Sequence, residues 1–262
     1  MSGINKFNKM IFTVHPAIIA VWAAVIAAGY LIPAFPLWGT GGRFSFANVL
    51  NPLSGIFFGP LGGALCSAVG GFIGSIIAPD TAWMGPFTFI IGTTTAFATG
   101  CVAWAKWPPV TICANGNFII NGAIVVYLIG TILWFTQEIG RNVFLYPLVV
   151  YGLGFIGFIV SIIFAKKLFS SGKRIMEFLA VGLFAFSGLI GGASIGNFFA
   201  LVLRKETEIQ WMALTIAAPI ERLIFAFGAA IVGVPLLMGL KKIGIITGPQ
   251  KEENKEETNN ES

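Results

Sequence analysis

Charged residues are scarce in this sequence of 262 residues: they make up 10% of it, while hydrophobic residues make up 56%. Soluble domains carry roughly a quarter charged residues on average, so this composition cannot cover the surface of a water-soluble globule. Glycine has no three-residue period and there are only three cysteines, which excludes collagen-like and disulfide-stapled classes. The composition excludes a soluble enzyme and leaves an integral membrane protein.

The residues of common catalytic sites are equally scarce. Histidine and aspartate each occur once, as His15 and Asp80, so no zinc-protease motif, paired intramembrane aspartates or Ser-His-Asp triad can be assembled. The cysteines lack the spacing of metal ligands, and no Gly-x-x-x-x-Gly-Lys-Ser/Thr phosphate loop occurs. We therefore predict a protein that is not an enzyme, without catalytic residues, metal or cofactor, and with no nucleic-acid partner.

Long apolar segments are abundant. Several run for about twenty residues, the length that crosses roughly 30 Å of hydrocarbon as a helix, whereas barrel strands alternate over about ten residues. We predict an all-α integral membrane protein with a polytopic domain at 1–247 and a disordered acidic tail at 248–262. Eight spans are expected, at 12–34, 46–58, 61–78, 86–105, 117–136, 143–165, 175–203 and 211–240. The turn at Gly59-Pro60 separates the second span from the third, and joining them gives a seven-helix alternative.

Basic residues are distributed unevenly between the ends of these spans. With eight spans and a cytoplasmic N-terminus, the inner set is Lys6, Lys9, Lys106, Lys166, Lys167, Lys173, Arg174, Lys241 and Lys242, and the outer set is Arg43, Arg141, Arg204 and Lys205. Because lysine and arginine favour the cytoplasmic side, this predicts a multi-pass protein of the cell (plasma) membrane with both termini in the cytoplasm.

Polar and aromatic residues gather in the segments predicted to face outward, the usual lining of a small-molecule pocket. Asn48 and Asn51 share one face of a short apolar helix and need partners there. Glu221 and Arg222 follow Pro219 inside the last span, where charged groups normally face a cavity or a partner. The candidate substrate-binding residues are Trp38, Arg43, Phe44, Asn48, Asn51, Trp83, Asn197, Glu221 and Arg222.

Other interpretations of these residues stay open. Trp38 and Trp83 also fit an interfacial aromatic belt, and Glu221 and Arg222 also fit ion pairs with another helix. Small residues at four-residue spacing allow helices to approach closely, as at Gly188, Gly192 and Gly196. The alanine face at Ala20, Ala24 and Ala28 fits internal packing or the docking of a helix from a second protein.

Residues 42–74, GRFSFANVLNPLSGIFFGPLGGALCSAVGGFIG, resemble the substrate-binding S component of energy-coupling factor (ECF) vitamin transporters, which have a Phe-Gly-Pro-x-x-Gly turn into a glycine-rich third helix. Residues 217–242 are similar to the last helix of that family. The resemblance implies a six-helix core, to which two extra spans at about 117–165 are added here. It also implies a substrate pocket in the outer half of the membrane.

By the same resemblance, Ala20, Ala24 and Ala28 would dock a transmembrane coupling subunit that works with two ATPase subunits. The expected function is membrane-embedded binding of a small vitamin-like solute for ATP-driven uptake. A stand-alone secondary transporter or channel, with Glu221 and Arg222 as coupling groups, is the first alternative. A lipid-acting membrane enzyme that uses Glu221, Arg222 and Asn197 is the second.

Overall fold

The computed structural model describes residues 15–36, 42–104, 111–114, 118–169, 171–204 and 206–244. The longer helices are α2 (Pro16–Tyr30), α3 (Ala47–Ile77), α4 (Phe89–Ala103), α5 (Gly122–Thr136), α7 (Leu145–Val160), α9 (Arg174–Arg204) and α10 (Glu208–Lys242). The shorter ones are η1 (Pro79–Thr81), η2 (Gly85–Thr88), α6 (Glu138–Asn142), the π-helical turn η4 (Ser161–Ala165) and α8 (Lys166–Phe169). The prediction of an all-α fold is confirmed.

Two short antiparallel hairpins complete the described chain. β1 (Pro33–Pro36) pairs with β2 (Arg43–Ser45), and β3 (Thr111–Ala114) pairs with β4 (Phe118–Asn121). Five helical segments of the described chain are long and apolar enough to cross a membrane, and α2 and α5 are shorter apolar helices. The chain is therefore an all-α membrane protein.

The predicted turn at Gly59-Pro60 divides α3 into two arms. Gly59 has a φ of 75° and a ψ of 178°, a conformation that breaks a helix and that glycine adopts without a Cβ penalty. The Oγ atoms of Ser54 and Ser67 are 2.8 Å apart, whereas thirteen residues of straight helix would separate them by about 20 Å. The second arm therefore folds back onto the first, which agrees with two separate predicted segments.

Two spans differ most from their predicted boundaries. The span expected at 117–136 begins only at Gly122, because 118–121 form strand β4 and the Asn121 side chain caps the helix by accepting from the N–H of Ala123 at 2.9 Å. The span expected at 12–34 is helical from Pro16 to Tyr30 and is followed by strand β1. Residues 12–14 and the acidic tail at 248–262 lie outside the described residues.

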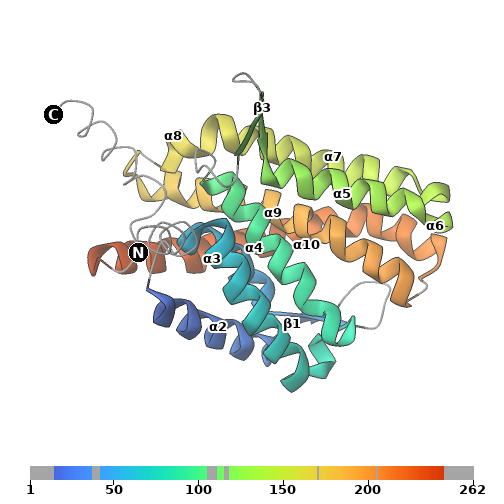
Figure 1. The fold of residues 1–262 in the computed structure, drawn as a ribbon, viewed down its shortest axis with the longest axis horizontal. Helices are drawn as coiled ribbons and strands as arrows, with labels where there is room; N and C mark the ends of the chain where they lie inside the picture. The colour runs from blue at the N-terminus through green and yellow to red at the C-terminus, as the bar shows by residue number, and fades with distance from the viewer. Residues whose placement is uncertain are drawn as a thin grey trace.

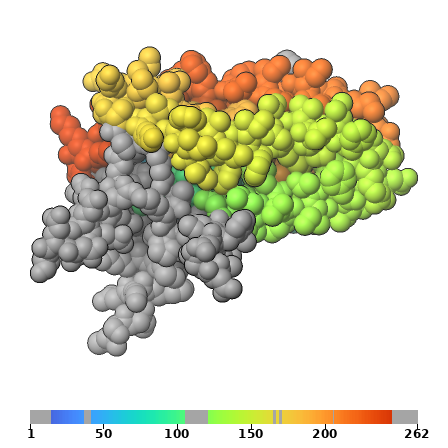
Figure 2. All heavy atoms as spheres, turned by 90° about the horizontal axis from the view of Figure 1, so that it is seen from above, coloured from blue at the N-terminus to red at the C-terminus, as the bar shows by residue number. Residues whose placement is uncertain are grey.

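The helices form three groups (Figure 1). α5 and α7 lie on one side and α2, α3 and α4 on the other, with α9 and α10 between them. Figure 2 looks onto the long face that α5 and α7 cover. Close packing in the middle depends on glycine: a Cβ at Gly188 or Gly192 of α9 would collide with Thr99 or Thr95 of α4. This confirms the predicted role of that ladder in helix packing.

The two ends of the bundle carry different elements. The start of α2, α8 and the end of α10 lie at one end, which we call the basic end because Lys167, Arg174, Lys241 and Lys242 belong to these segments and to the start of α9. The β1–β2 hairpin, η1, α6 and the α9–α10 connection lie toward the opposite end (Figure 1). The predicted sorting of charge between the two sides thus has a counterpart in the fold; which end is cytoplasmic stays a prediction.

Candidate functional site

A small cavity lies where α3, α4, α10, β2 and the η1–η2 segment meet. Five of the nine predicted substrate-binding residues line it: Phe44, Asn48, Asn51, Trp83 and Arg222. They come from stretches up to 178 positions apart in the chain, from Phe44 to Arg222. The volume is about 20 Å³, which is room for about one water molecule. We call this site the Arg222 cavity.

The β2–α3 junction positions Phe44 and the two asparagines. The N–H of Phe46 donates to the carbonyl of Ile32 at 2.9 Å, which holds the start of α3 against the end of α2. Asn48 donates its amide to the carbonyl of Ser45 at 3.1 Å. The Phe44 ring packs edge-on against Phe225 of α10, with centroids 5.1 Å apart. These contacts close the cavity on the hairpin side.

Asn51 is 3% exposed and packs against Gly92 of α4, where a Cβ would lie 2.7 Å from the Asn51 amide nitrogen. Its Oδ1 has no hydrogen-bond partner among the described residues. An unsatisfied buried carbonyl costs about 1–3 kcal/mol. The site therefore keeps a buried acceptor ready for an N–H or O–H donor in the cavity.

Arg222 lies within α10, three residues after Pro219. Pro219 has no N–H to donate to the carbonyl of Thr215 one turn earlier, so one backbone hydrogen bond of the helix is missing next to the charged pair. Arg222 is 9% exposed; its guanidinium lies over the Phe44 ring, 5.2 Å from the centroid, and its Nη1 is 3.8 Å from Oε2 of Glu221. Within the described part of the chain the guanidinium donates no hydrogen bond, so its donors remain available to an anionic group.

Glu221 is buried beside Arg222 but does not line the cavity. The 3.8 Å separation is at the long limit of an ion pair, as expected for adjacent positions that diverge around a helix. Of the two charged residues predicted in this span, Arg222 alone faces the Arg222 cavity. Glu221 partly balances its charge from the side.

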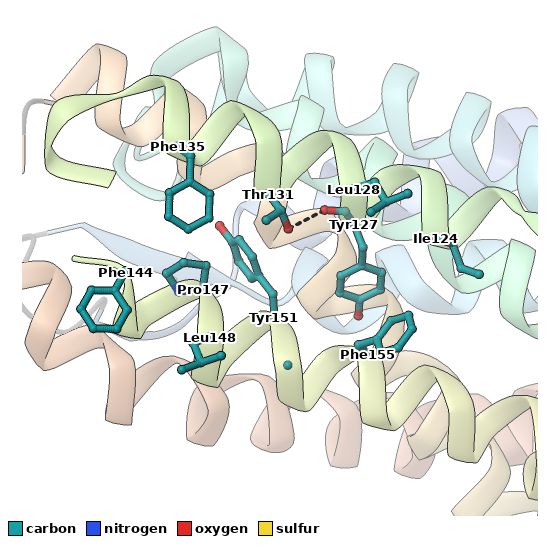
Figure 3. A pocket seen from close by; sticks show the side chains of 11 residues that line it. Ile124, Tyr127, Leu128, Thr131, Phe135, Phe144, Pro147, Leu148, Tyr151 and Phe155 are labelled. Carbon is teal, nitrogen blue, oxygen red and sulfur yellow. Dashed lines mark hydrogen bonds between the residues drawn. The ribbon is translucent and has the colours of Figure 1, made fainter. Parts of the chain in front are cut away.

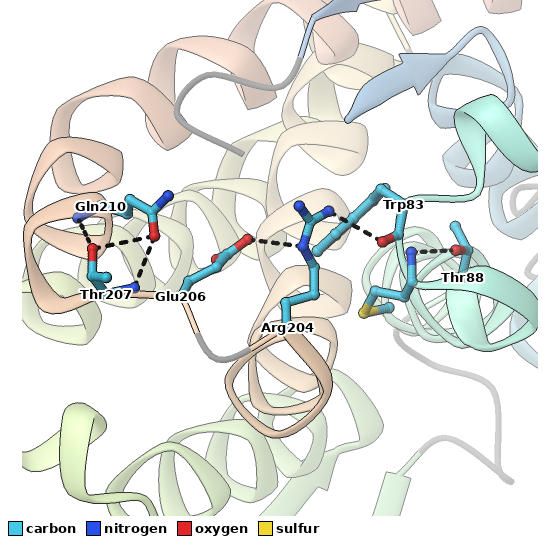
Figure 4. Close-up of polar contacts among 7 residues, drawn as sticks. Trp83, Thr88, Arg204, Glu206, Thr207 and Gln210 are labelled. Carbon is cyan, nitrogen blue, oxygen red and sulfur yellow. Dashed lines mark hydrogen bonds and ion pairs between the residues drawn. The ribbon is translucent and has the colours of Figure 1, made fainter. Parts of the chain in front are cut away.

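A second polar network ties the rim of the cavity to the α9–α10 connection (Figure 4). Arg204 donates from Nη1 to the Trp83 carbonyl at 3.1 Å, lies 5.6 Å from the Trp83 ring centroid, and pairs through Nε with Glu206 at 3.3 Å. Burial raises the pKa of Glu206, and the neighbouring Arg204 opposes this rise. Thr207 and Gln210 form the capping box that starts α10. Arg204 was not among the residues predicted for the site.

Asn197 lies outside the cavity, in a cluster of large rings that we call the Trp134 cluster, made of Trp134, Tyr146, Tyr151 and Trp211. Its amide donates to the hydroxyls of Tyr146 at 2.9 Å and Tyr151 at 3.2 Å. Trp134 stacks on Tyr146 at 4.9 Å and donates its Nε1–H to the carbonyl of Gly140 at 2.7 Å. Asn197 therefore has structural partners here.

The remaining predicted residues are dispersed. Arg43 is exposed on β2 and does not line the cavity, and Trp38 lies outside the described residues. Ala20, Ala24 and Ala28 are exposed along one face of α2, while Ala23 and Ala27 are buried. The predicted docking face of α2 is therefore exposed on the surface of the single chain.

Six further lining residues were not among the predicted ones: Tyr30, Ser45, Thr81, Thr88, Ile91 and Gly92. The Thr81 hydroxyl donates to the carbonyl of Tyr30 at 2.8 Å, which fastens η1 to the end of α2. The Thr88 hydroxyl accepts from the N–H of Met84 at 3.0 Å. The Met84–Thr88 bond is local, of the kind that threonine typically makes in turns, and was the only signal that the sequence offered; the Thr81–Tyr30 bond joins residues 51 positions apart and has no such signal.

Two larger grooves open on the apolar surface. One, of about 450 Å³, lies between α5 and α7, where Phe135, Pro147 and Tyr151 point into it (Figure 3). Its hydroxyls are engaged, since Tyr127 donates to the Ser187 carbonyl at 2.6 Å and Thr131 to the Tyr127 carbonyl at 2.8 Å. The other, of about 690 Å³, lies among α7, α9 and α10 and has an apolar lining. Neither offers the convergent polar groups that orient a polar solute.

Within the described residues, no group of three or more His, Cys, Asp or Glu side chains is placed to hold a metal ion. No protein-family model, curated protein or solved structure matches the chain.

Proposed function

We propose that this chain is the membrane-embedded substrate-binding subunit for ATP-driven uptake of a small vitamin-like solute. A separate transmembrane coupling subunit and two ATPase subunits would supply the energy, since the sequence contains no phosphate-binding loop. The observation that carries the solute-binding part is the convergence of Arg222, Asn51 and aromatic rings on one cavity.

The chemistry of the cavity indicates what the solute presents. Arg222 offers guanidinium donors to a carboxylate or phosphate, and Oδ1 of Asn51 accepts from an N–H or O–H group. Phe44 and Trp83 offer faces for a flat ring. A solute with an anionic group next to a flat ring that carries an N–H or O–H group would match the Arg222 donors, the Asn51 acceptor and the aromatic rings.

The volume of about 20 Å³ sets a condition on this proposal. A solute of vitamin size does not fit until side chains at the rim separate. Phe44 and Trp83 line the cavity from the hairpin and from the η1–η2 segment. Binding should therefore move Phe44 away from Phe225.

The exposed alanine face of α2 supports the proposed partnership. Ala20, Ala24 and Ala28 present small side chains at four-residue spacing, which permits close approach of a helix from a coupling subunit. In a bilayer such contacts depend on van der Waals packing, so one large side chain in the middle of the face should weaken docking.

A stand-alone secondary transporter is the second candidate, favoured by the buried Glu221–Arg222 pair. Ionisable groups within spans are typical of ion-coupled carriers. In this case uptake would be driven by an ion gradient without ATPases, and Glu221→Gln would abolish it.

Mass spectrometry of small molecules that stay bound through purification tests the binding site. We expect a bound solute in the wild type and in Arg43→Gln, and its loss in Arg222→Gln and Asn51→Leu. Equal solute in all four proteins would sink the site assignment.

Co-purification with candidate coupling and ATPase subunits tests the partnership. Ala24→Leu should reduce the recovered complex, while Ala213→Leu, the same change at an exposed position of α10, should not. No association of the wild-type chain, together with gradient-driven uptake in proteoliposomes, would favour the secondary transporter.

A further inference from the structure

The groove among α7, α9 and α10 has the dimensions of a lipid site. It encloses about 690 Å³, and its walls include the exposed side chains Ile156, Leu223 and Phe227. Gly182 lies along its floor, where a Cβ would be no closer than 3.9 Å to another atom, so the space there is open. Along α9 the groove extends from Phe178 to Phe186, which is about 12 Å of helix.

In a bilayer, an acyl chain is the expected content of an apolar groove that opens to the surface. Lipid tails are as apolar as the groove walls, so hydrophobicity alone does not select one lipid from another. Selection depends on the headgroup and on the charged residues at the end of the groove where the headgroup lies.

The groove ends next to a concentration of positive charge. Phe178 is one turn from Arg174, the first residue of α9, and Lys173 precedes it; Lys167 on α8 is also at this end, and all three basic side chains are exposed. The chain turns into α9 at Gly172, which has a φ of 68°. The positive end of the α9 helix dipole adds to the charge of these residues.

Acidic residues are few in the described segments that line or flank this end of the groove. Between residues 153 and 186 and between 223 and 244 the sequence contains one, Glu177. Lys241 of α10 interacts electrostatically with Glu177 and so offsets its charge. Lys167, Lys173 and Arg174 are left as net positive charge at the groove.

The α5–α7 groove provides an internal contrast. Arg141, the basic residue near its outer end, already donates to the carbonyls of Phe135 and Thr136, both at 3.2 Å, and Glu138 lies one helical turn away. That groove is apolar as well, but it lacks an uncommitted cluster of positive charge.

We propose that the groove among α7, α9 and α10 binds one anionic phospholipid, with an acyl chain against Gly182 and the phosphate at Lys167, Lys173 and Arg174. The site is separate from the Arg222 cavity, with which it shares no lining residue. The bound lipid would hold α7 and α8 against α9 at the basic end.

Native mass spectrometry of the full chain in a neutral detergent tests this site, with phosphatidylglycerol and phosphatidylcholine of identical chains added in turn. We expect phosphatidylglycerol to bind more tightly. Each basic residue near an anionic headgroup contributes about fivefold in affinity, so Lys173→Gln with Arg174→Gln should weaken phosphatidylglycerol about thirtyfold and phosphatidylcholine little. Arg43→Gln, at the opposite end, should change neither.

The acyl chain is tested with a pair of glycine variants. Gly182→Leu fills the proposed groove and should abolish the tight phosphatidylglycerol adduct, whereas Gly152→Leu fills the α5–α7 groove and should leave it intact; no atom lies within 4 Å of a Cβ at Gly152. Glycerol phosphate, the headgroup without chains, should not compete at millimolar concentration.

The proposal is overturned by equal binding of the two lipids, by wild-type affinity in the Lys173/Arg174 double variant, or by equal loss in Gly182→Leu and Gly152→Leu. Competition by glycerol phosphate would do so as well, because it would indicate a soluble-anion site. Thermal unfolding of each variant in the same detergent shows whether it is folded before its lipid binding is compared.

Discussion

The Arg222 cavity and the Trp134 cluster both bring polar side chains together with aromatic rings inside the bundle, and they differ in how those polar groups are satisfied. In the Trp134 cluster, Asn197 donates to two tyrosine hydroxyls and Trp134 donates to a backbone carbonyl. In the Arg222 cavity, Oδ1 of Asn51 has no partner among the described residues and Arg222 has one long ion pair.

This difference distinguishes a cluster with a structural role from the proposed solute site. Polar groups that satisfy one another fix the positions of α5, α7, α9 and α10, whereas unsatisfied groups beside a void carry a cost that a ligand can remove. The Trp134 cluster has one exception, since Nε1 of Trp211 lacks a hydrogen-bond partner in the described chain. The contrast nevertheless predicts opposite outcomes for matched substitutions in the two regions.

The largest effect is expected from removing the central ring of the Trp134 cluster. Trp134 is fully buried and its centroid is 4.8 Å from that of Trp211 and 4.9 Å from that of Tyr146. Trp134→Ala should lower the free energy of unfolding by about 3–5 kcal/mol through the cavity that it leaves. Reversible denaturation in mixed detergent micelles measures this loss.

Trp83→Ala is the matched control at the rim of the Arg222 cavity. Trp83 is half-buried and its carbonyl, which holds Arg204, is unchanged by the substitution. We expect about 1 kcal/mol of destabilisation, the size of a cation–π contact, together with weaker solute binding. A larger loss of stability at Trp83 than at Trp134 would contradict the division into a structural and a functional region.

A pair of asparagine substitutions sharpens the comparison. Asn197→Leu removes the amide that donates to two buried tyrosine hydroxyls, and it should lower the free energy of unfolding by about 1–3 kcal/mol. Asn51→Leu removes an acceptor that has no partner and should leave the free energy of unfolding unchanged or raise it. The same denaturation experiment measures both, and the assignment of the cavity fails if Asn51→Leu is the more damaging change.

The charge of Arg222 can be kept while its geometry changes. Arg222→Lys retains one positive charge next to Glu221 but removes the planar fork that binds a carboxylate or phosphate through two bonds. We expect the dissociation constant of the solute identified by mass spectrometry to rise about tenfold, or about 1.4 kcal/mol. Calorimetry in detergent measures it; unchanged affinity would mean that the solute has no anionic group at Arg222.

The sequence anticipated much of this fold because length and apolarity decide the membrane helices. The break at Gly59-Pro60 was also readable, since only glycine adopts that conformation cheaply. Strand β4 was missed because its apolar residues continue into α5 without a change in composition. Asn121, a good helix cap, was the available sign of the boundary.

The site was partly predictable for a different reason. Phe44, Asn48 and Asn51 are close to one another in the chain, and Trp83 is an aromatic residue of a segment predicted to face outward. Arg222 stood out because charge is rare within a span. Asn197 looked equivalent to Asn51 in the sequence, but the direction in which a helix presents a side chain depends on neighbours that periodicity does not identify. Its tyrosine partners are on α7, 46 and 51 residues away.

The smallest effect concerns Glu206, which links the rim of the Arg222 cavity to the α9–α10 connection through Arg204. Burial raises the pKa of Glu206 above the ordinary value of 4.5, so the Glu206 carboxyl group holds its proton more tightly in the folded chain than in the unfolded chain. The stability that it contributes is complete below pH 4.5 and is lost as the pH rises through the raised pKa.

Glu206→Gln should therefore flatten the fall in melting temperature above pH 4.5 and stabilise the chain near neutral pH by less than about 1 kcal/mol, since Arg204 offsets part of the burial cost. Glu138→Gln, an exposed change at the same end of the bundle, controls for the loss of one negative charge. A steeper fall in Glu206→Gln would show that the ionised carboxylate stabilises the rim. In that case the Arg204–Glu206 pair would belong with the satisfied groups of the Trp134 cluster.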